Sequence, residues 1–156
     1  MTRAPLILLL LIVACAPPIA ADAPPNTTSG GGGEDGDGPP ERVFGTIDYY
    51  GRPISVTVPE TVEVGETFSV TVVTYGNGCI DAGETDVRLE PQRAEIRPYD
   101  YNVTPGRPCD DTLNRYEHAA TVIFTKEGEA EVVVYGQRLA ETGATNTQVS
   151  RTVTVR

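Results

Sequence analysis

The sequence predicts an all-β fold, an antiparallel β-sandwich of about seven to eight strands. Apolar and polar residues alternate through most of the chain beyond residue 42, as they do in half-buried strands. Turn residues such as Gly, Pro and Asn separate these stretches at intervals of about ten residues, which favours a sandwich over a propeller or a solenoid. Val and Thr are abundant, whereas long runs of helix-forming Leu, Glu and Lys are missing.

The first half of the domain shows the alternation most clearly. Residues 43–50 open the domain, and residues 54–58 then place apolar side chains on one face. Residues 61–64 form a short piece between two turns. Residues 67–73 alternate until Val73, which adjoins another valine, so we expect a bulge or burial on both faces there.

The second half is less regular in its middle. Residues 87–89 and 94–96 predict two strands, and Pro98 interrupts the second, so both are expected at a sheet edge. Residues 99–116, which contain further prolines, are expected to form a long loop. The clear alternation then returns in the last expected strands, which comprise residues 120–124, 130–134 and 149–155.

Two of these stretches resemble parts of a known family. Residues 62–72 and 124–135 resemble the A′ to B and E to F hairpins of bacterial immunoglobulin-like domains. The resemblance implies an immunoglobulin-like β-sandwich and leaves the function open. The chain departs from antibody-type domains, because it has no Trp and its cysteines fall in expected loops, so a core bridge between the B and F strands is not implied.

The beginning of the chain has the layout of an export signal. A single basic residue precedes the apolar stretch 6–13, which is too short to span a bilayer as a helix. Residues 12–15, Ile-Val-Ala-Cys, resemble the lipobox of bacterial lipoproteins. That resemblance implies a signal peptide over residues 1–14 and a Cys15 that carries lipid, palmitate included, and anchors the protein in a membrane. The alternative is cleavage after Ala21, which would release the protein from the membrane.

The rest of the chain then divides into a linker and a domain. Residues 15–41 comprise the lipidated cysteine and a disordered linker rich in Pro, Gly and acidic residues, with a root-mean-square span of about 28 Å. Residues 42–156 form the immunoglobulin-like domain. The resemblance places the protein in a bacterial cell envelope, and Ala16 favours the outer membrane where the organism has one.

Charge and cysteine content limit the function classes. The 22 acidic residues outnumber the 12 basic ones, so binding to nucleic acid is not expected. Three cysteines are an odd number for an exported protein. If Cys15 is lipidated, Cys79 and Cys109 remain as a disulfide pair, which would stabilise the fold by roughly 3 to 4 kcal/mol.

Catalytic signals are weak. His118 is the single histidine, no nucleophile motif accompanies it, and we expect it to be partly buried and hydrogen-bonded to a loop. We therefore predict a non-enzymatic protein without a cofactor.

Acidic residues close to the two cysteines suggest a calcium site as an alternative. A disulfide would bring two expected acidic loops together, and carboxylate oxygens from both suit calcium. Solvation of these acids is the favoured interpretation. The candidate ligands in the two loops are Asp81, Glu84, Asp86, Asp100, Asp110 and Asp111.

Tyrosines give the strongest binding signal. Four of the seven flank the expected bridged loops: Tyr75, Tyr99, Tyr101 and Tyr116. Rigid aromatic rings on bridged loops make a recognition surface at low entropic cost, although the same rings would also serve to cap the core. A partner strand added along residues 99–103 is a further alternative.

We therefore expect a lipid-anchored envelope protein whose domain binds a protein or a glycan through these loops. An architectural or accessory subunit of an envelope complex is the alternative, and a calcium-dependent binding module is another.

Overall fold

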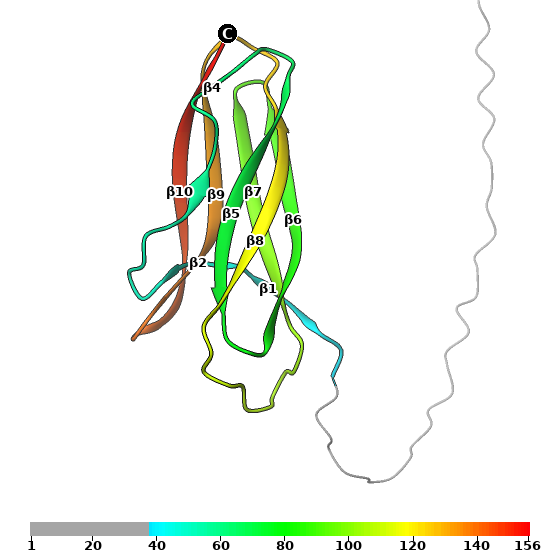
Figure 1. Cartoon of the computed structure of the whole chain (residues 1–156), viewed down its shortest axis with the longest axis vertical. Helices are drawn as coiled ribbons and strands as arrows, with labels where there is room; N and C mark the ends of the chain where they lie inside the picture. The colour runs from blue at the N-terminus through cyan, green and yellow to red at the C-terminus, as the bar shows by residue number, and fades with distance from the viewer. Residues whose placement is uncertain (1–37) are drawn as a thin grey trace, which may run out of the picture. The chain divides into compact units, whose positions relative to one another are not determined.

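A computed structural model describes residues 38–156, and all its regular elements are strands (Figure 1). The all-β prediction is confirmed. The predicted signal peptide, Cys15, Ala16, Ala21 and the predicted linker up to residue 37 lie outside the described residues. Among the described residues, no helix has the length and apolar character needed to cross a membrane. The strands are β1 (Glu41–Phe44), β2 (Thr46–Tyr49), β3 (Val56–Thr57), β4 (Thr61–Val62), β5 (Thr67–Gly76), β6 (Ile80–Glu90), β7 (Arg93–Asn102), β8 (Asn114–Ile123), β9 (Gly128–Ala140) and β10 (Gly143–Val155).

The strands form a curled sheet with two layers, as in a β-sandwich (Figure 1). One layer contains β5, which pairs with β8 along its whole length and with β3 on its other edge. The other contains β6, β7, β9, β10 and β4 in that order. β2 joins the layers, because Thr46 pairs with Tyr75 of β5 and with Gln137 of β9.

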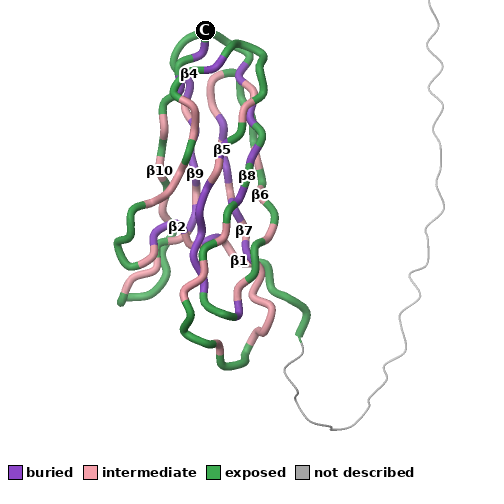
Figure 2. Tube along the Cα trace, viewed as in Figure 1, coloured by how far each residue is buried: buried purple, intermediate pink, exposed green. Residues whose placement is uncertain are grey.

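Alternate residues of the long strands fill the space between the layers. Each strand contributes every second side chain, as a pleated backbone requires. Val72 and Val73 are both buried, so the prediction of burial on both faces at Val73 is confirmed. Figure 2 shows buried segments along the inner strands and more exposed connections between them. The core includes Ile47, Val70, Val72, Ala94, Ile96, Ala120, Val122, Phe124, Val132, Val134 and Val153.

Strand β7 differs from its prediction in position and length. It is central, because β6 pairs with one side of it, and β9 and then β1 pair with the other. Pro98 is tolerated because it lies opposite Thr85, where the β6 register is already irregular, and its carbonyl accepts a hydrogen bond from the Gly45 N–H at 3.0 Å. Residues 99–102 belong to the strand, so the loop spans only residues 103–113. Strand addition at 99–103 is therefore wrong, since residues 99–102 pair with β1 on one side and residues 100–102 pair with β6 on the other.

The two stretches compared with immunoglobulin hairpins connect the layers instead of forming hairpins. β4 pairs in parallel with the end of β10, and the Val64 N–H donates to the Arg156 carbonyl, so this piece stays with β10 and not with β5. Likewise β8 pairs with β5, whereas β9 pairs with β10 and β7. The pairs β4–β10, β2–β9 and β7–β9 are parallel, while the other described pairings are antiparallel, as predicted for the sandwich.

Candidate functional site

A disulfide joins two connections at one end of the domain. Cys79 follows β5, Cys109 lies in the loop between β7 and β8, and their Cα atoms are 5.4 Å apart, so the predicted bridge is confirmed. Gly76 permits the tight chain path, because a Cβ atom there would lie 2.6 Å from the Ile80 Cβ. The Asn77 side chain accepts a hydrogen bond from the Cys79 N–H at 3.1 Å and holds the turn.

A cavity of about 220 Å³ lies beside this disulfide. Its walls come from five parts of the chain: β2, the end of β5 with the turn into β6, the end of β7, the loop 103–113 and the end of β9. All of these meet at the lower end of the domain in Figure 1. The lining residues are Thr46, Tyr49, Tyr75, Gly76, Asn77, Cys79, Ile80, Asn102, Cys109 and Leu139.

The cavity lining is uncharged and carries unused hydrogen-bonding groups. The hydroxyls of Thr46, Tyr49 and Tyr75 have no hydrogen-bond partner among the described residues. None of them is fully buried, because the one fully buried side-chain polar atom without a partner in residues 38–156 is Thr104 Oγ1. The side-chain oxygens of Asn77 and Asn102 accept backbone N–H groups, at 3.1 and 3.2 Å, which leaves both amide nitrogens as donors. Polar groups that line a cavity and have no partner among the described residues can donate to and accept from a polar ligand.

Three neighbouring aromatic rings extend from the cavity to the surface. The Tyr49 ring lies 6.0 Å from the Tyr75 ring and 4.8 Å from the Tyr50 ring, measured between centroids. Tyr50 is 54% exposed and has a φ of 49°, and Gly51 follows at 74°. A hydrogen bond from the Arg52 N–H to the Tyr49 carbonyl closes the turn. A tyrosine in this left-handed region is strained by about 1 to 2 kcal/mol.

The other predicted tyrosines lie elsewhere and are already engaged. Tyr99 stacks against Phe44 and lies beneath the Arg42 guanidinium, 3.5 Å from its ring centroid. The Tyr101 hydroxyl donates to Glu84 at 2.7 Å, which raises the pKa of Tyr101 and lowers the pKa of Glu84. The Tyr116 hydroxyl donates to the Ile80 carbonyl, and burial raises its pKa. Only Tyr75 of the predicted four lines the cavity.

Sequence reasoning missed most of the remaining lining, above all Tyr49 and Asn102. One signal was present, since Tyr49 precedes the exposed Tyr50-Gly51 turn. Tyr49 lies close to Tyr75 because β2 pairs with both layers, and no local sequence pattern reveals this pairing.

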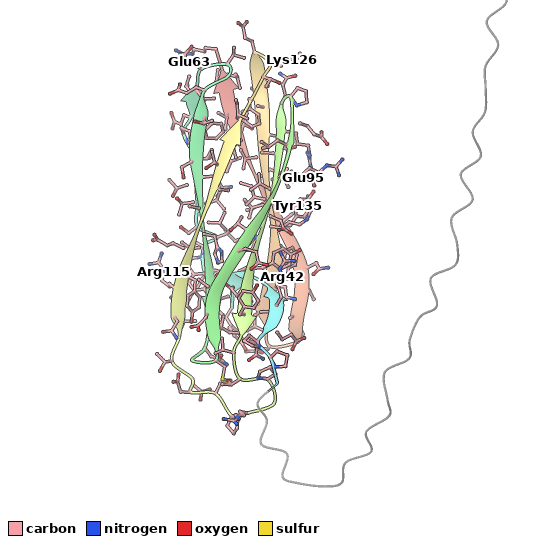
Figure 3. All side chains as sticks on the ribbon, turned by 90° about the vertical axis from the view of Figure 1, so that its right-hand side faces the viewer. Arg42, Glu63, Glu95, Arg115, Lys126 and Tyr135 are labelled. Carbon is pink, nitrogen blue, oxygen red and sulfur yellow. A yellow bond between two sulfur atoms is a disulfide. The ribbon has the colours of Figure 1, made fainter. Side chains whose placement is uncertain are left out.

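The predicted calcium ligands are dispersed. Asp81, Glu84 and Asp86 lie in strand β6 instead of a loop. Arg42, labelled in Figure 3, forms ion pairs with Glu84 at 2.5 Å and with Asp86 at 3.1 Å. Asp110 and Asp111 lie in the loop 103–113, and the Asp110 side chain accepts the Thr112 N–H at 2.9 Å. Across residues 38–156, no group of three His, Cys, Asp or Glu side chains is placed to hold a metal ion.

His118 occupies a closed polar cluster inside the sandwich. It is 2% exposed in the middle of β8, and its Nε2 lies 3.0 Å from both the Asp100 carboxylate and the Thr74 hydroxyl. Its expected partly buried position beside a loop is therefore wrong: the partners come from strands β5, β6 and β7. Asp100, an expected loop acid, is buried in β7.

This cluster contains the residue types of a catalytic triad in a different geometry. A triad places the acid on one ring nitrogen and the nucleophile on the other. Here Asp100 and Thr74 share Nε2, and the Nδ1 atom lies 3.4 Å from the Thr85 hydroxyl. All three members are almost fully buried, so a substrate has no access to them.

No family model, curated protein or solved structure matches this chain. The cavity beside the disulfide is the candidate functional site because it combines concave shape, aromatic walls and unused polar groups.

Proposed function

We propose that this protein is a non-enzymatic, lipid-anchored protein of a bacterial cell envelope whose domain binds a protein or glycan partner through the cavity beside the Cys79–Cys109 disulfide. One observation carries the binding proposal: an uncharged cavity is lined by Thr46, Tyr49 and Tyr75, whose hydroxyls have no hydrogen-bond partner among the described residues. A ligand in this cavity could pair with hydroxyls that no neighbouring residue already engages.

The anchoring part of the proposal is supported by the sequence before the domain. The short basic start, the apolar stretch and the Ile-Val-Ala-Cys motif ending at Cys15 fit a lipidated protein, with the outer membrane favoured by Ala16. A membrane anchor and a linker would present the domain to partners near the membrane.

The non-enzymatic part is supported by the closed cluster of His118. A general base has to reach a substrate proton, directly or through one water. The His118 ring is instead enclosed by Thr74, Asp100 and Thr85.

Site-directed photocrosslinking tests the binding site in the full-length, membrane-anchored protein. A photoreactive residue replaces Leu139, which lines the cavity, and in a matched control it replaces Val64, which is exposed near the other end of the domain. We expect a discrete partner to be captured from position 139 and not from position 64. The same products from both positions, or none from position 139, would contradict the proposed site.

The anchor has a separate test. We expect Cys15→Ala to move the protein out of the membrane fraction and to remove acyl chains from its intact mass. Continued membrane association with an unchanged mass would exclude lipidation at Cys15, and a mature protein beginning at Asp22 would favour the alternative cleavage.

An architectural role is the second candidate, because strand β10 has an open edge. β9 pairs with β10 from Gly143 to Val155, whereas the only other strand on β10 in the described part is β4, at Thr154 and Val155. Such an edge can accept a strand of an envelope partner. A charged substitution there, Ser150→Lys, is expected to dissociate an envelope complex only if this second function holds, and a Tyr75 variant would then have no effect.

A further inference from the structure

The cavity lining restricts the class of ligand, and this step rests on the proposed binding function. None of the lining residues is acidic or basic. A charged ligand would be desolvated there without an opposite charge to compensate it. The ligand group that enters is therefore neutral.

The size of the cavity restricts the ligand further. A volume of about 220 Å³ is below the roughly 300–1,000 Å³ of pockets for drug-sized molecules and corresponds to about seven waters at ~30 Å³ each. One six-membered ring with its substituents is of this order, whereas an extended peptide is not.

The distribution of polar groups favours a sugar ring. The hydroxyls of Thr46, Tyr49 and Tyr75 both donate and accept, and the amide nitrogens of Asn77 and Asn102 donate. A pyranose has hydroxyls around its rim, which both donate and accept, and apolar C–H groups on its faces, which pack on aromatic rings. The Tyr49 and Tyr75 rings are the aromatic walls of this cavity.

The strands beside the cavity offer few free backbone groups to a peptide ligand. Strand addition needs an unpaired strand edge, but Tyr75 is paired with Thr46 of β2 on one side and Arg115 of β8 on the other. The backbone beside the cavity is thus already in use.

The walls are also held in place before a ligand arrives. The disulfide, the Gly76 contact with Ile80 and the hydrogen bond between Asn77 and Cys79 restrain the turn. A preorganised site loses little side-chain and loop entropy on binding.

We infer that the cavity lined by Tyr49 and Tyr75 binds a single neutral pyranose ring, such as a hexose or an N-acetylhexosamine at the end of a glycan. A monosaccharide with about a dozen non-hydrogen atoms is expected to bind with a Kd of about 1 mM, in keeping with the efficiency of small ligands.

Saturation-transfer NMR on the full-length protein in detergent tests this inference. The probes are methyl glucoside, methyl galactoside and N-acetylglucosamine, and glucuronate is the charged control. We expect saturation of at least one neutral sugar and not of glucuronate. Tyr75→Phe, which keeps the ring and removes the unpaired hydroxyl, should weaken binding about two- to tenfold. Tyr99→Phe, on the other side of β7, is the matched control and should leave it unchanged.

The outcomes separate this inference from the function on which it rests. Absence of saturation by any neutral sugar, with a partner still captured from position 139, overturns the sugar assignment and retains a binding module for protein. Absence of both overturns both. Sugar binding that Tyr75→Phe does not weaken, or that glucuronate shares, also overturns the assignment to this cavity.

Discussion

Thr74 and Tyr75 are consecutive buried residues that both carry a hydroxyl, yet the surroundings of the two hydroxyls differ. The Thr74 hydroxyl lies among strands, 3.2 Å from Asp100 and 3.0 Å from His118, in a cluster closed to solvent. The Tyr75 hydroxyl has no partner among the described residues and adjoins a cavity. The difference teaches that the burial of a residue does not by itself separate a structural polar group from a binding one; the partners of its polar atom and its position beside a cavity have to be considered together.

On the outer face of β7 and β9, polar side chains pair with one another, as Thr74 pairs with its neighbours. There the Tyr135 hydroxyl lies 3.4 Å from Glu95, and both residues are labelled in Figure 3. The Arg97 guanidinium lies 4.7 Å from the centroid of the Tyr135 ring. Arg97 also forms an ion pair with Glu95 at 2.9 Å. This tyrosine is rich in partners, which makes it a structural element of the sheet surface.

Removing His118 would break the closed cluster most severely. We expect His118→Ala to lower the free energy of unfolding by about 3 to 5 kcal/mol, because it removes a buried side chain and leaves Thr74 as the remaining side-chain partner of the buried Asp100 carboxylate. Urea denaturation measures this loss. Arg115→Ala, at an exposed position of the same strand, is the control and should change stability by no more than about 0.5 kcal/mol. Equal stabilities of the two variants would show that the cluster is not structural.

Removing the disulfide tests the cavity region and has the next largest expected effect. We expect the double change Cys79→Ser and Cys109→Ser to lower stability by about 3 to 4 kcal/mol, since the bridge spans a sequence separation of 30 residues. Both cysteines also line the cavity, so crosslinking from position 139 should be lost even below the unfolding temperature. Crosslinking retained by a folded double variant would separate binding from the bridge.

A matched pair of hydroxyl deletions tests the comparison itself. Thr74→Val is expected to lower stability by about 1 to 3 kcal/mol and to leave ligand binding intact, because it removes one member of a closed cluster. Tyr75→Phe is expected to keep stability within about 0.5 kcal/mol and to weaken binding. Urea denaturation and ligand binding are measured on both variants. Weaker binding by Thr74→Val with a large loss of stability in Tyr75→Phe would refute the contrast between the two residues.

The smallest effect is expected on the outer face, at Glu84. The hydrogen bond from Tyr101, together with Arg42, lowers the pKa of Glu84 below its ordinary value of 4.5. Its contribution to stability is therefore complete above that value and is lost as the pH falls through the lower pKa of the folded state. Wild type should lose stability on acidification more steeply than Glu84→Gln below about pH 4.5. Parallel melting curves of the two proteins across that range would contradict it.

Local patterns were sufficient for much of this structure. Alternation predicted strands around Val70, Val122 and Val132, because a pleated backbone has a period of two wherever one face is buried. The pairing of Cys79 with Cys109 followed from the interpretation of Cys15 as a lipid carrier, and the bridge is present. The sequence also predicted four tyrosines near the bridged connections, although three of them are engaged by other residues and do not line the cavity.

The cavity was decided by tertiary structure alone. Tyr49 meets Tyr75 because Thr46 pairs with both β5 and β9, which are distant in the chain. Pro98 enters a central strand because β6 is irregular opposite it, and Asp100 becomes buried because His118 and Thr74 satisfy its carboxylate. The sequence by itself determined which side chains alternate, since that depends on neighbours. Only the long-range pairing of strands determined which polar groups are paired and which are left for a ligand.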